Sequence, residues 1–304
     1  MRKISRLLVL LVLPLLLVMM TIGCSSPRNT ASEVITVGSK DFTESFILGE
    51  MYASMLENRG LKVQRKFNLG GTPVAHAALL SGQIDLYPEY TGTGLLTVLK
   101  LPVNHNPQQV FETVAKAYQE QFKLVWLTPS PMDNKTVLAM TQATAKKYGI
   151  KTISDMVANA SKLTIIAPPE FQGREDGLPG LKKLYGDFKF KKLIPTDPGL
   201  RYKAIANGQA DVVLAFGTDG ELTTLNLVLL EDDKAFYPPY HVAPVVRAAV
   251  LEVQPTLRDA LNGLAPKITD EVMRRLNYEV SGKQREPADV AKEFLRETGL
   301  LKPS

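Results

Sequence analysis

The chain has 304 residues, a formal net charge of +5 and a single cysteine. Three of the basic residues lie within the first six positions, so the chain beyond residue 23 carries about +2, which is not the charge of a nucleic-acid-binding protein. One cysteine excludes an intramolecular disulfide framework, and the length suits one two-lobed domain or two small domains.

The N-terminus has the pattern of an export signal. Arg2, Lys3 and Arg6 precede an unbroken apolar run over residues 7–20, which is shorter than the roughly 20 residues that a membrane-spanning helix needs. A charged start, a short apolar core and small residues after it are typical of a secretory signal peptide, which we predict over residues 1–23. The alternative is an uncleaved anchor helix.

Cys24 lies directly after this segment, in the sequence Thr21-Ile22-Gly23-Cys24. This sequence resembles the lipobox of bacterial lipoproteins, in which the cysteine is acylated and becomes the new N-terminus, although Thr21 stands where leucine is usual. The resemblance implies lipid attachment at Cys24 and a polar, lipid-anchored tether over residues 24–33. We therefore expect an extracytoplasmic, membrane-anchored protein, in the periplasm or on the outer face of the cytoplasmic membrane.

From residue 34 onward, apolar strands alternate with helices. We expect strands over residues 34–38, 61–69, 84–87, 136–140, 163–167, 211–216 and 242–250. We expect helices from an N-cap at Asp41 or Thr43 to about residue 58, from an N-cap at Thr72 to residue 81, and over residues 144–148, 153–160, 178–185, 200–207 and much of 255–301. Strand–helix–strand units of this length predict parallel sheets with right-handed crossovers, and hence an α/β fold.

One internal similarity points to a ligand site. Residues 78–86 and 204–212 share a helix end, a Gly-Gln-x-Asp turn and the start of a strand, and an aromatic residue follows each aspartate by five positions: Tyr90 and Phe216. Two similar lobes would each place an aromatic side chain at the carboxyl end of an equivalent strand, where ligands bind in open α/β sheets. The alternative is a chance match of ordinary turn residues.

The residues over 37–44 (Val-Gly-Ser-Lys-Asp-Phe-Thr-Glu) and 85–93 (Asp-Leu-Tyr-Pro-Glu-Tyr-Thr-Gly-Thr) resemble the substrate-binding proteins of osmoprotectant importers, which bind glycine betaine, choline and carnitine. Matches at 126–129, 216–220 and 244–247 extend the resemblance to essentially the whole chain after the tether. It implies the type II periplasmic binding protein fold, in which each lobe is a mixed, mainly parallel sheet flanked by helices and two crossovers join the lobes. Lobe I is expected over residues 34–135 and 239–304, and lobe II over 136–238.

The resemblance also implies a site. A trimethylammonium group is held best by aromatic faces, and a carboxylate by charged donors. By resemblance, the cage positions are Tyr90, Phe216 and Tyr240, and the carboxylate-holding positions are Lys40, Thr93 and Arg174. A packed tyrosine at 240 and solvated charges at 40 and 174 are the alternatives. Thr136 stands where the family often has another aromatic, so this cage should bind a simple betaine more weakly or suit a different ligand.

The expected partners are a small quaternary ammonium ligand, a permease and an ATPase on separate chains, and the membrane through the N-terminal lipid. We expect a monomer with no nucleic acid, cofactor or metal. An enzyme is disfavoured because none of the three histidines has metal-ligand spacing and no catalytic motif is present. Among the carboxylates near the expected cleft, capping and turn roles account for Glu44 and Asp85. The remaining alternatives are a bulkier betaine or an amino-acid-like ligand, or a structural lipoprotein.

Overall fold

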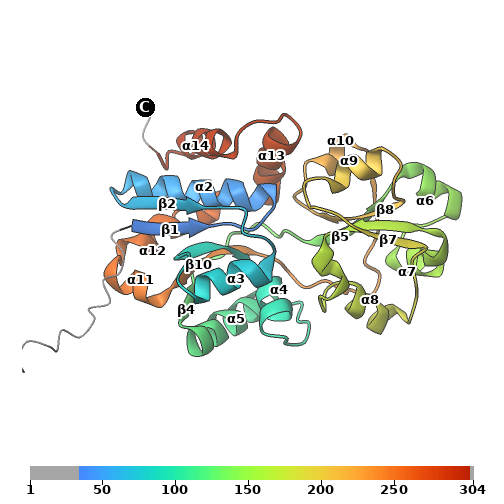
Figure 1. The fold of residues 1–304 in the computed structure, drawn as a ribbon, viewed down its shortest axis with the longest axis horizontal. Coiled ribbons are helices and arrows are strands. Elements are labelled where there is room, and N and C mark those ends of the chain that lie inside the picture. Colours follow the sequence, from blue (N-terminus) through green and yellow to red (C-terminus); the bar gives the residue numbers. More distant parts are fainter. Residues whose placement is uncertain (1–33, 302–304) are drawn as a thin grey trace, which may run out of the picture. The chain divides into compact units, whose positions relative to one another are not determined.

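The computed structural model describes residues 34–301, so the predicted signal peptide, Cys24 and the whole tether lie outside the described residues. Two five-stranded sheets form the framework (Figure 1). In order across the sheet, the first contains β2 (Lys62–Lys66), β1 (Val34–Gly38), β3 (Leu86–Tyr90), β10 (Val242–Arg247) and β4 (Leu124–Trp126). The second contains β7 (Lys192–Pro195), β6 (Thr164–Ala167), β8 (Val212–Phe216), β5 (Thr136–Met140) and β9 (Val228–Leu229).

Each sheet is parallel except for one reversed strand. β1 pairs in parallel with β2 and β3, and β6 pairs in parallel with β7 and β8. The reversed strands, β10 and β5, each follow a segment in which the chain crosses from one sheet to the other, and each pairs antiparallel with both of its neighbours. The expectation of an α/β fold with two mixed, mainly parallel sheets is therefore confirmed.

Helices cover both faces of the first sheet because its central strands are apolar on both sides. Leu86 and Tyr87 are successive residues of β3, and they belong to two different hydrophobic clusters. On one face lie α2 (Thr43–Asn58), α12 (Thr256–Asn262), α13 (Asp270–Ser281) and α14 (Pro287–Glu297), and on the other α3 (Thr72–Leu80) and α5 (Pro107–Phe122) (Figure 1). The short helices α4 (Thr91–Thr93) and α11 (Ala248–Val253) follow β3 and β10 directly.

The second sheet is covered in the same way. Ile165 and Ile166 of β6 face different clusters, and the second of these clusters includes Tyr202 and Ile205 of α9. The helices of this part of the chain are α6 (Gln142–Tyr148), α7 (Ile153–Ala158), α8 (Leu178–Tyr185), α9 (Arg201–Ala206) and α10 (Glu221–Thr224). Within residues 34–301, no helix has both the length and the hydropathy needed to cross a bilayer.

The internal similarity in the sequence corresponds to equal structures in the two sheets. Asp85 exchanges two hydrogen bonds with Thr36 in β1, and Asp211 exchanges two with Thr164 in β6, and all four bonds are 2.8 Å long. The glycines of both turns have positive φ angles, +74° at Gly82 and +70° at Gly208. As a result, β3 and β8 start in the same way, and each of them ends at the predicted aromatic residue.

Several local expectations were wrong. The strand expected over 84–87 runs over Leu86–Tyr90, and the strand expected over 242–250 ends at Arg247, where α11 begins. Neither Asp41 nor Thr43 caps α2, whose N-cap is the extended residue Phe42. In α3 the N-cap is Gly71, one residue before Thr72. The helix α5 was not predicted, although Asn106 caps it with a side-chain hydrogen bond.

Candidate functional site

Three aromatic side chains from three separate segments meet where β3 and β8 end. The ring of Phe42, directly before α2, lies 6.1 Å from the ring of Tyr90 and 6.2 Å from that of Phe216, measured between centroids. The internal similarity in the sequence placed Tyr90 and Phe216 at this edge, whereas Phe42, which connects them, was not among the predicted site residues. Phe42 lies inside the motif over residues 37–44, so its position in that motif was the available signal.

The fourth aromatic residue, Tyr240, packs on the turn that follows β3. A Cβ atom added at Gly92 would lie only 2.8 Å from the Tyr240 ring, so the glycine allows this close approach. The side chains of Tyr90 and Tyr240 are almost inaccessible, with 4% and 3% of their surface exposed. Burial is also the main cause that raises the pKa of both tyrosine hydroxyls, so both remain protonated donors.

Lys40 is buried in an ion pair and is not the solvated surface charge considered as its alternative. Its Nζ atom lies 2.5 Å from the Glu89 carboxylate and 5.1 Å from the centroid of the Tyr90 ring. The same carboxylate accepts hydrogen bonds from the Tyr87 hydroxyl and from the backbone N–H of Tyr90, each 2.7 Å long. Glu89 thus fixes both the ammonium group and the end of β3.

Arg174 and Tyr240 are joined through Asp176, which was not among the predicted site residues. The Arg174 guanidinium donates to Asp176 through Nε at 2.7 Å and Nη2 at 2.5 Å, and the Tyr240 hydroxyl donates to it at 2.7 Å. Burial acts to raise the pKa of the Asp176 carboxyl, but the positive charge of Arg174 and these hydrogen bonds outweigh it and hold the pKa below its ordinary value. Within residues 34–301, Nη1 of Arg174 has no hydrogen-bond partner.

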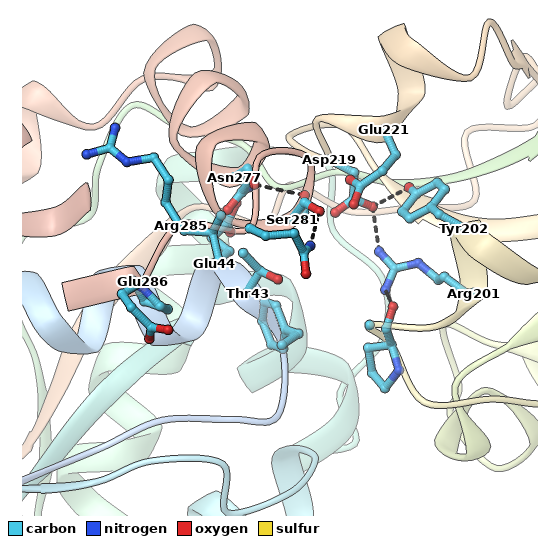
Figure 2. Close-up of a pocket in the computed structure, with 16 residues that line it drawn as sticks. Thr43, Glu44, Arg201, Tyr202, Asp219, Glu221, Asn277, Ser281, Arg285 and Glu286 are labelled. Atoms are coloured by element: carbon cyan, nitrogen blue, oxygen red, sulfur yellow. Dashed lines mark hydrogen bonds and ion pairs between the residues drawn. The ribbon is translucent and has the colours of Figure 1, made fainter. Parts of the chain in front are cut away.

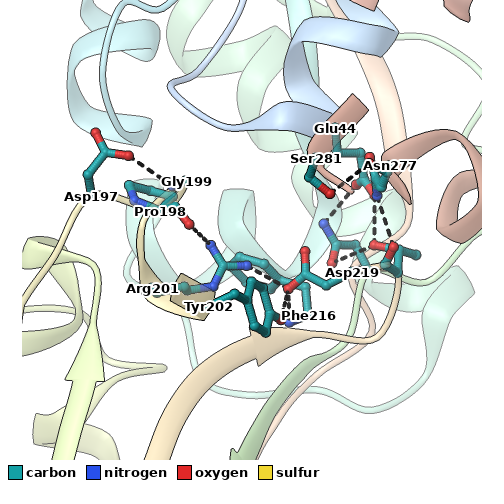
Figure 3. Close-up of polar contacts among 12 residues, drawn as sticks. Glu44, Asp197, Pro198, Gly199, Arg201, Tyr202, Phe216, Asp219, Asn277 and Ser281 are labelled. Atoms are coloured by element: carbon teal, nitrogen blue, oxygen red, sulfur yellow. Dashed lines mark hydrogen bonds and ion pairs between the residues drawn. The ribbon is translucent and has the colours of Figure 1, made fainter. Parts of the chain in front are cut away.

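Glu44 is the most heavily hydrogen-bonded carboxylate of the site, and the capping role expected for it was wrong. Its Oε1 atom accepts from the Tyr90 hydroxyl and the Asn134 amide, both at 2.7 Å. Its Oε2 atom accepts from the Thr218 hydroxyl at 2.6 Å. The same atom accepts from the Asn277 amide at 2.9 Å (Figure 3). The four donors come from four separate segments, and Thr218 follows β8 of the second sheet. Burial is the main cause that raises the pKa of Glu44, and the hydrogen bonds act against it.

A third ion pair lies beside Phe216. Arg201, from the start of α9, donates to Asp219 at 2.5 Å, and its guanidinium lies 5.1 Å from the centroid of the Phe216 ring. Asp219 also accepts from the Tyr202 hydroxyl at 2.5 Å and from the backbone N–H of Phe216 at 2.7 Å (Figure 3). Asp219 therefore fixes the end of β8 in the way that Glu89 fixes the end of β3.

A cavity of about 310 Å³ lies beside these groups (Figure 2). Its walls come from the segment before α2, from α9 and the loop after β8, and from the region where α13 meets α14. The lining residues include Phe42, Glu44, Arg201, Asp219 and Asn277. Among the described residues, no group of three or more histidine, cysteine, aspartate or glutamate side chains is arranged to hold a metal ion.

Five of the predicted site residues fall into two groups. Lys40 lies over the Tyr90 ring, and Phe42 links that ring to Phe216. Arg174 and Tyr240 form the other group through Asp176. Thr93 is buried at the end of α4, and Thr136 is buried opposite Phe216 in the pairing of β5 with β8.

Two lobes of this topology, with aromatic and charged side chains gathered at the ends of their strands, define a solute-binding protein of the type II periplasmic class. The chain belongs to the family described as the substrate binding domain of ABC-type glycine betaine transport systems, whose model matches residues 33–297. The family expected from the sequence motifs is therefore confirmed.

Relatives and solved structures agree with this assignment. The chain is 38% identical over 284 residues to the carnitine transport binding protein OpuCC of Listeria monocytogenes, covering 92% of both chains. It is 37% identical over 276 residues to the ergothioneine transport permease/ergothioneine binding protein EgtU of Helicobacter pylori, covering 90% of this chain and 49% of that protein. A crystal structure of a glycine betaine/carnitine/choline ABC transporter matches with a TM-score of 0.70 and 32% identity, over 88% of this chain and 100% of that chain.

The position of Phe42 between two aromatic rings predicts a measurable role. We expect Phe42→Leu to weaken the binding of quaternary ammonium compounds by about 0.5–2 kcal/mol, because it removes one aromatic face near the cation. Isothermal titration calorimetry with glycine betaine and choline measures the effect. The matched control is Phe111→Leu, which alters another half-buried phenylalanine in a different hydrophobic cluster and should leave both affinities unchanged. Equal affinities for Phe42→Leu and the native protein would show that Phe42 only packs between the lobes.

Proposed function

We propose that this substrate-binding protein captures a quaternary ammonium osmoprotectant, such as glycine betaine, between its lobes and presents it to an ABC importer. The observation that carries the proposal is the meeting of aromatic side chains from both lobes, Phe42 and Tyr90 from one and Phe216 from the other. Carnitine, ergothioneine and glycine betaine, which name the relatives, share a trimethylammonium group and a carboxylate. Such a cation cannot donate a strong hydrogen bond, so aromatic faces suit it best.

In this proposal the cage consists of Tyr90, Phe216 and Tyr240, with Phe42 as a further wall. The hydroxyls of Tyr90 and Tyr240 donate to carboxylates, which fixes the orientation of both rings. The ligand carboxylate is held by Lys40, Thr93 and Arg174. A lysine or arginine side chain that is already paired with an acidic residue still has further N–H groups to donate. Nη1 of Arg174 is one such group.

A bulkier betaine is the second candidate ligand. The cavity of about 310 Å³ beside Phe42 is lined by polar groups such as Asp219 and Asn277, which could hold additional hydrogen-bonding groups of a larger ligand. Thr136, buried opposite Phe216, takes less space than the aromatic residue that the family often has there. Native mass spectrometry of protein exposed to a crude metabolite extract distinguishes the two candidates by ligand mass, and an amino-acid ligand would refute both.

The proposed contacts to the cation and the carboxylate of the ligand predict that substitutions affect glycine betaine and choline differently. Arg174→Ala should weaken the binding of glycine betaine by about 1.5–3 kcal/mol, the scale of a hydrogen bond to a charged group. Choline has the cation without the carboxylate, so its affinity should stay equal or increase. Tyr90→Ala should weaken the binding of both ligands. Calorimetric titration of both variants tests this, with thermal unfolding as the control for folding. If neither variant alters either affinity, the proposed site is wrong.

Ligand entry requires the lobes to separate, because Tyr90 and Tyr240 are buried. Two crossovers joining two lobes are a hinge of the kind that closes around ligands, and closure strengthens polar contacts by excluding water. Small-angle X-ray scattering should therefore give a smaller radius of gyration with saturating ligand than without it. An identical profile, with a ligand whose binding calorimetry has established, would exclude hinge closure.

The N-terminal segment predicts how the protein is kept near its importer. We propose that the chain is exported, acylated at Cys24 and held at the membrane as a monomer, and that the permease and ATPase are separate chains. Cys24→Ala should then release the protein from the membrane fraction while the affinity of the binding domain stays unchanged. Cell fractionation measures this. Full membrane retention of the variant would indicate an uncleaved signal anchor.

A further inference from the structure

The positive side chains around the aromatic residues are each neutralised by a carboxylate of the protein. Lys40 pairs with Glu89, Arg174 with Asp176, and Arg201 with Asp219, each with a contact of 2.5 Å. These pairs are buried or nearly so. Because each pair combines two opposite charges in contact, it contributes almost no net charge to the interior. The charge of the site therefore depends on the groups outside these three pairs.

Glu44 is such a group, and it has no cationic partner. Only 2% of its surface is exposed, and its four hydrogen bonds come from a phenol, a hydroxyl and two amides. Within residues 34–301, no lysine, arginine or histidine forms an ion pair with it. Burial without a cationic partner raises the pKa of the Glu44 carboxyl, and a positive charge brought close would favour its ionised form.

The position of Glu44 suits a charge supplied by the ligand. Its Oε1 atom lies 2.7 Å from the Tyr90 hydroxyl, at the edge of a ring that the proposed cage contributes, and Glu44 and Phe42 both line the cavity. A cation within about 6 Å of the Tyr90 ring centroid would lie roughly 6–8 Å from the carboxylate, close enough for a substantial interaction in a water-poor site.

We propose that Glu44 is a specificity-determining residue that supplies the counter-charge for the quaternary ammonium group of the ligand. The inference rests on the proposed function, because it needs a cationic ligand in the cage. Thr218 belongs to the opposite lobe from Glu44, so the hydrogen-bonded carboxylate reaches this arrangement only when the lobes meet. The negative charge favours a monocation more than a zwitterion, because the carboxylate of a zwitterion is repelled by Glu44.

The test compares two ligands that differ in net charge. Glu44→Gln keeps the shape of the side chain and removes its charge. The ratio of choline affinity to glycine betaine affinity should fall by on the order of tenfold in this variant, as expected for one charge acting at this distance. The ratio does not depend on the fraction of protein that is folded, so calorimetry with both ligands on one preparation is sufficient.

Thr218→Val is the matched control. It removes one hydrogen bond to Glu44 and leaves the carboxylate charged. It should therefore weaken the binding of both ligands and leave the ratio of their affinities unchanged. A rescue variant places the carboxylate on the neighbouring residue. Asn277 donates to Glu44 at 2.9 Å, so the double variant Glu44→Gln, Asn277→Asp returns a negative charge to nearly the same position. This variant should restore the ratio, and it tests the inference even if Glu44→Gln alone folds poorly.

The outcomes separate this inference from the proposed function. If the native protein binds neither choline nor any betaine, the proposed function fails. If both ligands bind and Glu44→Gln lowers both affinities by the same factor, Glu44 is only a hydrogen-bonding link between the lobes and the inference is overturned. A lower ratio that the double variant restores supports the role of the charge.

Discussion

The architecture depends on satisfying one buried carboxylate. Glu44 lies in the first turn of α2, yet its hydrogen-bond donors come from the end of β3, the first crossover, the loop after β8 and the helix α13. No local segment could supply these donors, so the carboxylate is satisfied only when distant parts of the chain and both lobes come together. Leaving such a group unsatisfied costs more than a typical hydrogen bond contributes, and this makes the arrangement of the lobes specific.

The ends of the two equivalent strands are fixed by the same device. Glu89 accepts from the backbone N–H at the end of β3, and Asp219 accepts from the backbone N–H at the end of β8. Each carboxylate also neutralises a cation that lies over the adjacent aromatic ring. Tyr90 and Phe216 are therefore held at the ends of their strands by backbone hydrogen bonds as well as by packing, and the proposed cage would be preorganised, with a small entropic cost of binding.

The sequence was informative wherever the signal was local. The turn at Asp85 and its equivalent at Asp211 placed Tyr90 and Phe216 at the ends of their strands, because glycine, aspartate and strand length act over a few residues. The motif with Phe42 and Glu44 was recognised, but their roles were not, because a phenylalanine next to a helix start and a glutamate in its first turn both have common local explanations. Which distant side chains they meet is decided by tertiary contacts that spacing alone does not encode.

The pairing of the two crossovers attaches Tyr240 to the lobe that carries Tyr90. The backbone of Asn134 donates to Tyr240 at 3.2 Å, the backbone N–H of Tyr240 donates to Asp133 at 2.7 Å, and Val242 pairs with Tyr90 at the start of β10. Tyr240 is thus attached to the first sheet through the end of β3, whereas Asp176 belongs to the other lobe. If the lobes separate as proposed, the bond between Tyr240 and Asp176 breaks while the two tyrosines stay together. In the proposed site, a ligand arriving from solvent would then meet a half-site already assembled on one lobe, to which the second lobe adds Phe216 and Arg174.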